Sequence, residues 1–322
     1  MKKQSMIFKQ LVKLVKFQRI MAANYSSTSS AEVPLRFVQF IRKNESNKLL
    51  GVLSNDGETL HPLPEGTCQN DMINLIKQDT KVLLKKLQSL PSEQLCSDIE
   101  LLPPVTNPEK IVCIGLNYLD HCLEQHKAKP KEPMFFSKFA STLIGHGGNV
   151  IAHNISNKID FEVELAVIIG KEAKNVSKEN AMDYVFGYSV AQDISARDWQ
   201  KERNGGQFLI GKSMDTFCPL GPAIVHKSLV NDPHHLQMIT RINGIEKQNG
   251  NTMDMIYEID DIIHELTKSI TLKPGDVILT GTPAGVGMYR NPPEYLKPGD
   301  TIESEIECVG KLFNKVVADE CI

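Results

Sequence analysis

The segment Asp160-Phe-Glu-Val-Glu-Leu-Ala-Val-Ile-Ile-Gly170 is the stretch from which the rest of the fold can be worked out. Side chains alternate between the two faces of a strand, so Glu162 and Glu164 would share one face and Val163 and Leu165 the other. The carboxylate face continues as apolar residues, which predicts a strand buried on both sides. Two adjacent carboxylates in apolar surroundings are costly unless they are protonated or bridged by a cation. The segment therefore favours a divalent-cation site over the alternative, a pair of solvated glutamates.

A second glutamate-rich segment, Thr301-Ile-Glu-Ser-Glu-Ile-Glu-Cys308, serves as a comparison. Here the glutamates alternate with apolar or small residues along the whole segment. That pattern is typical of an amphipathic strand with one face in solvent. Glu303, Glu305 and Glu307 are therefore predicted to be solvated.

A third carboxylate follows the next predicted strand, in Val190-Ala-Gln-Asp-Ile-Ser-Ala-Arg-Asp-Trp-Gln200. Asp193 lies directly after the strand, and it would complete an all-oxygen set of three carboxylates suited to Mg²⁺, Mn²⁺ or Ca²⁺. The alternative is that Asp193 helps to cap the helix that follows. Ser195 and Asp198 have the spacing of a helix cap with an acid in the first turn, and we assign Asp198 to that cap.

Lys212 follows a short apolar run in Leu209-Ile-Gly-Lys-Ser213. A buried ammonium beside carboxylates and a metal is a recurrent acid–base or electrostatic group. A lone lysine is more often solvated, so the sequence around Lys212 does not decide its role by itself.

A glycine-rich loop, Ile278-Leu-Thr-Gly-Thr-Pro-Ala-Gly-Val-Gly287, comes directly after a predicted buried strand. It lacks the Gly-Lys-Ser/Thr sequence of a phosphate-binding loop. Its free N–H groups and threonine hydroxyls could hold a substrate carboxylate. A plain tight turn is the alternative.

His121 and Glu124 are three residues apart in Asn117-Tyr-Leu-Asp-His-Cys-Leu-Glu124, so they share one face if the segment is helical. A carboxylate can orient an imidazole that acts as a general base toward water. This pair is therefore a candidate for hydrolytic chemistry.

The composition is that of an ordinary soluble globular protein: 322 residues, 36 lysines and arginines, 39 acidic residues and 41% hydrophobic residues. No run approaches the roughly 18 consecutive apolar residues of a membrane-spanning helix, so we expect no membrane association. No basic stripe indicates nucleic-acid binding. Seven cysteines without a C-x-x-C motif predict reduced thiols in an intracellular compartment.

The chain divides into three predicted parts. Residues 1–31 carry six basic and no acidic residues, with apolar residues at helical intervals and a serine-rich end, as in a mitochondrial transit peptide; a disordered basic tail of a cytoplasmic protein is the alternative. Residues 32–105 are predicted to form a small N-terminal α+β subdomain with strands over 35–42 and 49–53 and a helical pattern over 71–90. A proline-rich connector over 101–108 separates it from a catalytic domain over 106–322.

The catalytic part alternates short β-rich runs with glycine and proline turns. Strands are expected over residues 111–116, 162–169, 185–192, 223–225, 238–242, 276–280 and 301–318. Many strands and few helices predict a β-rich α+β fold and argue against a doubly wound α/β sheet.

Taken together, these motifs resemble the fumarylacetoacetate hydrolase family, and within it the domain-containing protein 2 branch. The resemblance covers residues 32–319. It rests on five ordered motifs: Asn117-Tyr118-x-x-His121-x-x-Glu124, Glu162-x-Glu164, Gln192-Asp193-x-Ser195-Ala196-Arg197-Asp198, Gly211-Lys212-Ser213 and Thr280-Gly281-Thr282-Pro283-x-Gly285-Val286-Gly287.

The resemblance implies a mixed β-sandwich roll in which Glu162, Glu164 and Asp193 bind Mg²⁺ or a similar ion. Lys212 would lie beside the metal-bound substrate. Substrate contacts are implied at Arg197, Gln200, Gly281 and Thr282, and a mobile lid would carry His121 and Glu124. The resemblance also suggests a homodimer.

The implied substrates are 1,3-dicarbonyl acids such as acylpyruvates and oxaloacetate. A metal that stabilises an enolate would permit proton transfer at C3, C–C hydrolysis or decarboxylation. We expect keto–enol tautomerisation of oxaloacetate, with acylpyruvate hydrolysis or oxaloacetate decarboxylation as the alternative. A second alternative is a scaffold that binds a metal and a keto acid without turnover.

Overall fold

The computed structural model describes residues 35–43, 45–79, 87, 91–94 and 98–320. The chain forms two units by internal contacts, Met1–Val33 and Pro34–Ile322, and the following paragraphs concern the second. The predicted transit peptide over 1–31 lies outside the described residues.

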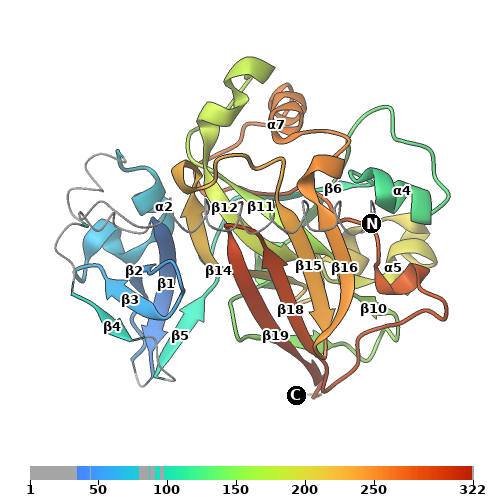
Figure 1. The fold of residues 1–322 in the computed structure, drawn as a ribbon, viewed down its shortest axis with the longest axis horizontal. Coiled ribbons are helices and arrows are strands. Elements are labelled where there is room, and N and C mark those ends of the chain that lie inside the picture. Colours follow the sequence, from blue (N-terminus) through green and yellow to red (C-terminus); the bar gives the residue numbers. More distant parts are fainter. Residues whose placement is uncertain (1–34, 44, 80–86, 88–90, 95–97, 321–322) are drawn as a thin grey trace, which may run out of the picture. The chain divides into compact units, whose positions relative to one another are not determined.

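A 12-stranded sheet forms the larger part of this unit (Figure 1). Its main path runs through β4 (Glu93–Gln94), β3 (Thr59–Pro62), β2 (Leu49–Leu53), β1 (Arg36–Arg42), β14 (Cys218–His226), β12 (Val185–Gln192), β11 (Val163–Ile169), β17 (Val277–Leu279), β6 (Ile111–Gly115) and β7 (Met134–Lys138). Two further strands lie off this path: β5 (Ile99–Leu102) pairs with β1, and β8 (Leu143–Ile144) pairs with β14. Because β1 is hydrogen-bonded to β14, the sheet continues across the predicted subdomain boundary.

A second sheet of five strands carries the C-terminal part of the chain. Its order is β16 (Ile245–Asn251), β15 (Gln237–Ile242), β18 (Thr301–Ile306), β19 (Gly310–Ala318) and β9 (Asn149–Ala152), and a separate pair joins β10 (Ile159–Asp160) to β13 (Ser195–Ala196). Most pairings are antiparallel, but β6–β17, β8–β14 and β9–β19 are parallel. The predicted β-rich fold with mixed sheets is confirmed.

Strand β11 has the two faces that its sequence predicts. Val163, Leu165 and Val167 belong to one buried apolar cluster, which also contains residues of β12, of the second sheet and of α7 (Ile259–Thr267). The opposite face begins with the glutamates. The strand therefore anchors the core on one side and presents carboxylates on the other.

Short helices complete the unit. They are η1 (Thr67–Asn70), α2 (Met72–Ile76), α4 (Leu119–Glu124), η2 (Ala140–Thr142), η3 (Lys178–Tyr184), α5 (Arg197–Lys201), η4 (Asn204–Gly206), α6 (Leu209–Lys212), η5 (Lys227–Leu229), η6 (Thr252–Asp254) and η7 (Gly287–Tyr289). In the part of the chain that the structure describes, no helix is long and apolar enough to cross a membrane.

The predicted helical pattern over 71–90 is interrupted after Ile76, although Leu87, in the same range, is helical. Asp71 caps it, accepting a hydrogen bond from the Asn74 N–H at 3.1 Å, but the helix ends at Ile76. Residues 77–79 leave the helical path, and the Gln78 amide bonds to the Asn74 carbonyl. Polar side chains that bond to nearby backbone compete with helix continuation, which the apolar spacing alone did not reveal. Residues 80–86 and 88–90 of that prediction lie outside the described residues.

Packing between the two sheets can be tested with a matched pair of substitutions. Ile306 is 1% exposed within the core cluster, whereas Ile245 is 61% exposed in the hairpin between β15 and β16. We expect Ile306→Ala to lower the free energy of unfolding by about 2–5 kcal/mol, because it leaves a cavity. Ile245→Ala should change it by less than about 0.5 kcal/mol. Urea unfolding measures both, and equal losses would contradict this assignment of the core.

Candidate active site

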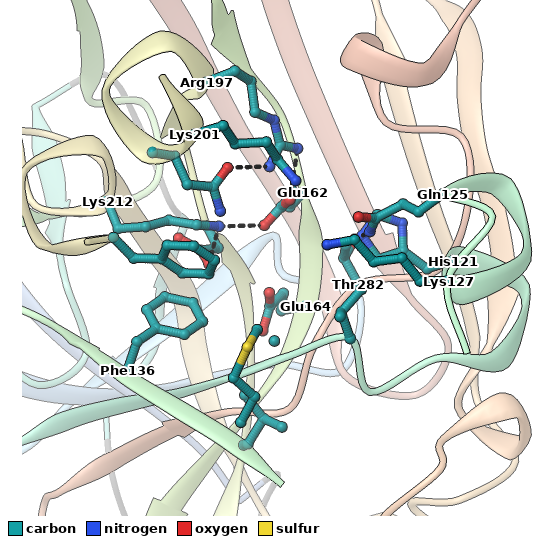
Figure 2. A pocket seen from close by; sticks show the side chains of 17 residues that line it. His121, Gln125, Lys127, Phe136, Glu162, Glu164, Arg197, Lys201, Lys212 and Thr282 are labelled. Atoms are coloured by element: carbon teal, nitrogen blue, oxygen red, sulfur yellow. Dashed lines mark hydrogen bonds and ion pairs between the residues drawn. The ribbon is translucent and has the colours of Figure 1, made fainter. Parts of the chain in front are cut away.

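A small pocket opens beside the carboxylate face of β11 (Figure 2). It encloses about 80 Å³, and its walls come from β7, β11, α4, α5, α6 and the loop after β17. The lining residues are Ile114, Gly115, Leu116, His121, Gln125, Lys127, Met134, Phe136, Glu162, Glu164, Asp193, Arg197, Gln200, Lys201, Phe208, Lys212 and Thr282. The space suits a small polar molecule.

Three buried carboxylates meet at the base of this pocket. Glu162, Glu164 and Asp193 each offer an oxygen within 4.8 Å of the others. Backbone pairing brings them together, because the Asp193 N–H donates to the Glu162 carbonyl at 2.9 Å. The Gln192 side chain fixes the Glu162 backbone by accepting its N–H at 2.8 Å. The predicted convergence of these three residues is therefore present in the structure.

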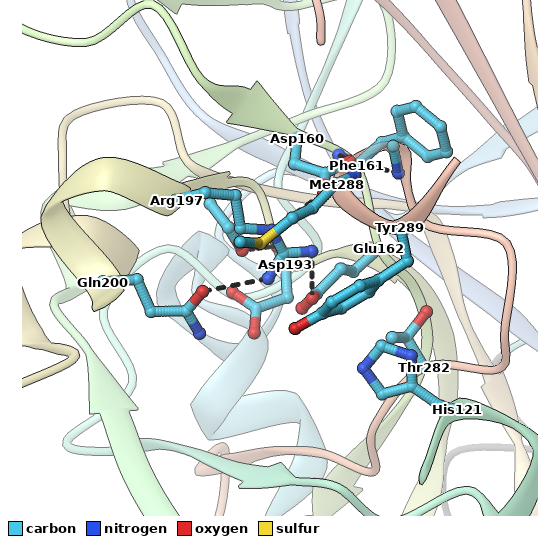
Figure 3. Close-up of polar contacts among 12 residues, drawn as sticks. His121, Asp160, Phe161, Glu162, Asp193, Arg197, Gln200, Thr282, Met288 and Tyr289 are labelled. Carbon is cyan, nitrogen blue, oxygen red and sulfur yellow. Dashed lines mark hydrogen bonds and ion pairs between the residues drawn. The ribbon is translucent and has the colours of Figure 1, made fainter. Parts of the chain in front are cut away.

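Cations that are distant in sequence surround the carboxylates. Lys212 Nζ donates to Glu162 Oε2 and to Asp193 Oδ2, both at 2.6 Å, and lies 5.1 Å from the centre of the Phe136 ring. Arg197 pairs with Glu162 at 2.6 Å (Figure 3). Compensation of the glutamate charge thus comes partly from the protein itself and not from a bound ion alone.

The surroundings shift the pKa values of the two glutamates in opposite directions. Burial opposes ionisation of Glu162, but Arg197 and Lys212 outweigh it and hold the pKa of Glu162 well below its ordinary value. Burial together with Asp193 and Glu162 raises the pKa of Glu164 well above its ordinary value. Burial opposes the charge of Lys212, yet Asp193 and Glu162 outweigh it and raise the pKa of Lys212. Glu164 is therefore the carboxylate whose charge the protein leaves uncompensated.

The residues present fit a hard divalent cation. All three donors are carboxylate oxygens, which Mg²⁺, Mn²⁺ and Ca²⁺ prefer. Glu164 receives one backbone hydrogen bond, from the Gly281 N–H at 2.7 Å, and no ion pair within the described residues. Asp193 Oδ1 lies 2.8 Å from Lys138 Nζ but receives no aligned hydrogen bond. The Glu164 carboxylate and Asp193 Oδ1 thus keep the capacity to coordinate an ion.

Several charged residues around the pocket escaped the sequence analysis, among them Lys138 and Asp160. Lys138 ends β7 after two phenylalanines, and its buried ammonium also donates to the carbonyls of Ile194, at 3.1 Å, and Lys212. Asp160 accepts from Arg197 Nε at 2.8 Å and from two backbone N–H groups of η7. Two features of the sequence could have pointed to these residues. Lys138 ends a segment that contains two phenylalanines, and Asp160 begins the segment that contains Glu162 and Glu164.

The glycine-rich loop binds the protein's own carboxylates. Besides Gly281, the N–H groups of Ala284 and Gly285 donate to Asp120 and Glu124 at 3.0 and 2.9 Å. These three N–H groups are therefore not free for a substrate carboxylate, whereas the Thr282 hydroxyl of the same loop keeps its proton to donate. Gly281 itself has φ of 97°, and a Cβ there would lie 2.9 Å from Asn117 Cβ, so only glycine fits.

The predicted pair on α4 is formed. His121 Nδ1 lies 2.5 Å from Glu124 Oε1, and His121 Nε2 lies 2.6 Å from the Gln125 side-chain amide. Gln125 in turn accepts from the Tyr289 hydroxyl at 3.0 Å, and that hydroxyl accepts from Lys201 Nζ at 3.0 Å. These contacts run from Lys201 through Tyr289, Gln125 and His121 to Glu124, so both ring nitrogens of His121 have a side-chain partner that holds the ring in place.

The implied substrate contacts differ in their availability. Gln200 accepts from Arg197 Nη1 at 3.0 Å, and both line the pocket (Figure 3). Thr282 Oγ1 accepts from the Gln248 amide at 2.8 Å, which leaves its own proton to donate. Gly281 uses its N–H for Glu164, and it is absent from the residues that line the pocket.

The predicted helix cap at Ser195 is wrong. Ser195 lies in β13, and its hydroxyl donates to the Asp193 carbonyl at 2.8 Å. Helix α5 begins two residues later, after Ala196 and without a side-chain cap. Asp198 instead accepts from the Ser156 hydroxyl at 2.6 Å. Pairing of β13 with β10 extends the strand geometry through Ser195 and thereby delays the helix.

Comparison with known proteins agrees with this geometry. Residues 110–317 match the family described as fumarylacetoacetate (FAA) hydrolase C-terminal. Oxaloacetate tautomerase fahd2, mitochondrial, from Xenopus laevis is 45% identical over 297 residues, which cover 90% of this chain and 92% of that protein. Oxaloacetate tautomerase YisK from Bacillus subtilis is 46% identical over 224 residues, which cover 68% and 74%.

A solved structure extends the comparison to the fold. Fumarylacetoacetate hydrolase from the psychrophilic Exiguobacterium antarcticum has a TM-score of 0.76 and 35% identity, and the match covers 88% of this chain and 99% of that one. With the family match over most of the described catalytic part, the chain belongs to the fumarylacetoacetate hydrolase family.

Proposed function

We propose that this protein is a divalent-metal-dependent enzyme that interconverts the keto and enol forms of oxaloacetate. The observation that carries the proposal is the small pocket that joins three buried carboxylates to the Lys212 ammonium. Relatives named oxaloacetate tautomerase, at 45–46% identity, support the choice of substrate and reaction.

Glu162, Glu164 and Asp193 would hold the cation, with Mg²⁺ as first choice and Mn²⁺ or Ca²⁺ as alternatives. A bound divalent cation would supply Lewis acidity that stabilises negative charge developing on the substrate's oxygens. Arg197 holds Glu162 in place from the other side and, with Gln200 and Thr282, is proposed to orient the keto acid. Lys138 holds Asp193 in the same way.

Lys212 is proposed to move the proton. Its raised pKa keeps Nζ protonated at neutral pH, so the resting side chain can donate a proton or stabilise charge but cannot accept a proton. Tautomerisation moves one proton between the C2 oxygen and C3 and breaks no C–C bond. A buried ammonium at the pocket base, pairing with Glu162 and Asp193, suits protonation of the enol at C3, and the neutral amine left behind would take up the proton released by the C2 hydroxyl, so that Lys212 ends as an ammonium again.

Acylpyruvate hydrolysis or oxaloacetate decarboxylation is the second candidate, favoured by the His121–Glu124 pair. Hydrolysis needs a base for water, and His121 Nε2 is the nitrogen that could accept its proton. In this structure that nitrogen already accepts from Gln125. Water activation would therefore require Gln125 to turn away, whereas tautomerisation would not. A scaffold that binds a metal and a keto acid without turnover is the second alternative, and it predicts binding without enol–keto exchange.

We also propose that residues 1–31 direct the protein to mitochondria, as their charge pattern predicts, and that the described unit works as a homodimer. The word mitochondrial in the name of the Xenopus laevis relative supports the first proposal. We further propose that the N-terminal subdomain spans residues 32–105 and the catalytic domain spans residues 106–322.

Substitutions at His121 and Lys212 should separate the candidate reactions. We expect His121→Ala to abolish any pyruvate release from acylpyruvate or oxaloacetate while keeping most of the enol–keto exchange. Lys212→Ala should slow the exchange by about a hundredfold or more, the usual cost of losing a positioned acid. The measurement follows the decay of enol absorbance beside pyruvate release at fixed Mg²⁺. His235→Ala, at an exposed histidine paired with Asp232, is the matched control.

Lys212→Arg distinguishes proton transfer from charge compensation, because arginine keeps the positive charge but does not give up its proton. Loss of exchange in this variant, with an unchanged melting temperature, supports proton transfer by Lys212. The tautomerase proposal fails if wild-type protein releases pyruvate as fast as it equilibrates the enol, or if Lys212→Ala retains full exchange.

The proposed mitochondrial targeting by residues 1–31 can be tested separately from the catalytic activity. A reporter fused to residues 1–31 should enter mitochondria, because the segment is basic and lacks acidic residues. Protein that starts near Glu32 should retain full activity. A reporter that stays in the cytosol, or a shortened protein that does not fold, would contradict the assignment.

A further inference from the structure

Two lysines line the pocket without an anionic partner. Lys201 ends α5, and Lys127 follows the Gln125 segment after α4. Among the residues that the structure describes, neither ammonium forms an ion pair. Figure 2 shows Lys201 beside Arg197 and Glu162, and Lys127 beside His121 and Gln125. The pocket therefore has cationic groups that the carboxylate cluster does not use.

Lys201 is held in position by Tyr289. Its ammonium donates to the Tyr289 hydroxyl at 3.0 Å and lies 5.6 Å from the centre of the same ring. A lysine ammonium has three N–H donors, so two remain for another partner. Tyr289 is in turn anchored through Gln125, whose side chain accepts from its hydroxyl. The position is thus built by specific contacts and is not that of a free surface lysine.

The nearby carboxylates cannot serve as the missing partner. Glu162 is already bound by Arg197 and Lys212, and Asp193 by Lys212 and Lys138. Burial, Arg197 and Lys212 oppose the charge of Lys201 and outweigh the attraction of Glu162, so the pKa of Lys201 is lowered. A half-buried ammonium among other cations is unfavourable unless an anion joins it. An anionic ligand that enters the pocket would meet this need.

We infer that Lys201, positioned by Tyr289 and assisted by Lys127, binds the second carboxylate of a dicarboxylic 2-keto acid. The inference rests on the proposed function and makes it more specific. The 2-keto acid end would face Glu162, Glu164 and Asp193, and the distal carboxylate would face the lysines. Lys201 is then the residue that selects oxaloacetate over acylpyruvates, which carry a neutral acyl group at that end.

The test compares two ligands that share the 2-keto acid end. Oxaloacetate carries a distal carboxylate, and acetylpyruvate carries an acetyl group in its place. KM and kcat for enol–keto exchange are measured with Mg²⁺-loaded wild-type protein, Lys201→Met and Lys201→Arg. We expect Lys201→Met to raise KM for oxaloacetate by about tenfold or more, the effect of losing one charged hydrogen bond, with little change in kcat. KM for acetylpyruvate should stay within about twofold of the wild-type value.

Two further variants bracket the result. Tyr289→Phe removes only the hydroxyl that holds the ammonium. It should raise KM for oxaloacetate by about threefold, because one hydrogen bond that positions Lys201 is lost. Lys201→Arg should recover most of the wild-type preference, which a merely structural role would not predict. Lys268→Met, at an exposed lysine of the α7 end that pairs with Glu265, is the control and should change neither KM.

The outcomes separate this inference from the proposed function. Equal rises in KM for both ligands in Lys201→Met, or no change for oxaloacetate, would overturn the assignment of Lys201 even with wild-type exchange intact. Absence of exchange in wild-type protein would instead contradict the proposed function. In that case calorimetry with the same two ligands decides the subsite, because Lys201→Met should weaken binding of oxaloacetate alone.

Discussion

The structure depends on the burial of several carboxylates at one point of the large sheet. Glu162, Glu164 and Asp193 are each at most 4% exposed, and ionised carboxylates in such surroundings require compensation. Arg197 and Lys212 come from α5 and α6, and Lys138 from β7, so three separate elements must pack around β11 to supply it. The same packing encloses the pocket. Charge compensation therefore explains why short helices cover this face of the sheet.

The compensation is unequal, and this inequality gives the site its chemistry. Glu162 is held ionised by two cations, whereas Glu164 forms no ion pair with any of the described residues and accepts the Gly281 N–H. A divalent ion would complete the cluster at the carboxylate that the protein leaves without a cation. The glycine-rich loop contributes indirectly, since its other N–H groups bind the carboxylates of α4 and hold His121 at the pocket. Helix α4, the glycine-rich loop and the three carboxylates thus form one connected polar network.

Local sequence patterns were sufficient for β11, β12 and the carboxylates, but β7, β9 and β16 were not predicted, and the run over 301–318 is two strands, β18 and β19. The alternation in residues 160–170 predicted both faces of β11, and Asp193 was placed by its position after β12. Patterns of this kind report burial and period, so they do not reveal partners that only tertiary packing brings together. Lys138 meets Asp193 across 55 residues of sequence, and the Tyr289–Lys201 contact joins the last residue of η7 to the last residue of α5. The misplaced cap at Ser195 has the same origin, because the pairing of β13 with β10 overrides a local capping signal.

The account's central claim is that Glu164 completes a divalent-cation site, and titration calorimetry with Mg²⁺ tests it most directly. Glu164→Gln keeps the size of the side chain and an oxygen for the Gly281 N–H but removes the charge. Glu305→Gln, on the solvent-facing side of β18, is the matched control. The account predicts a single Mg²⁺ site in wild-type protein and in the control, and a loss of affinity of about a hundredfold or more in Glu164→Gln, since a full ligand charge is removed. Unchanged Mg²⁺ affinity in a folded Glu164→Gln protein would contradict it.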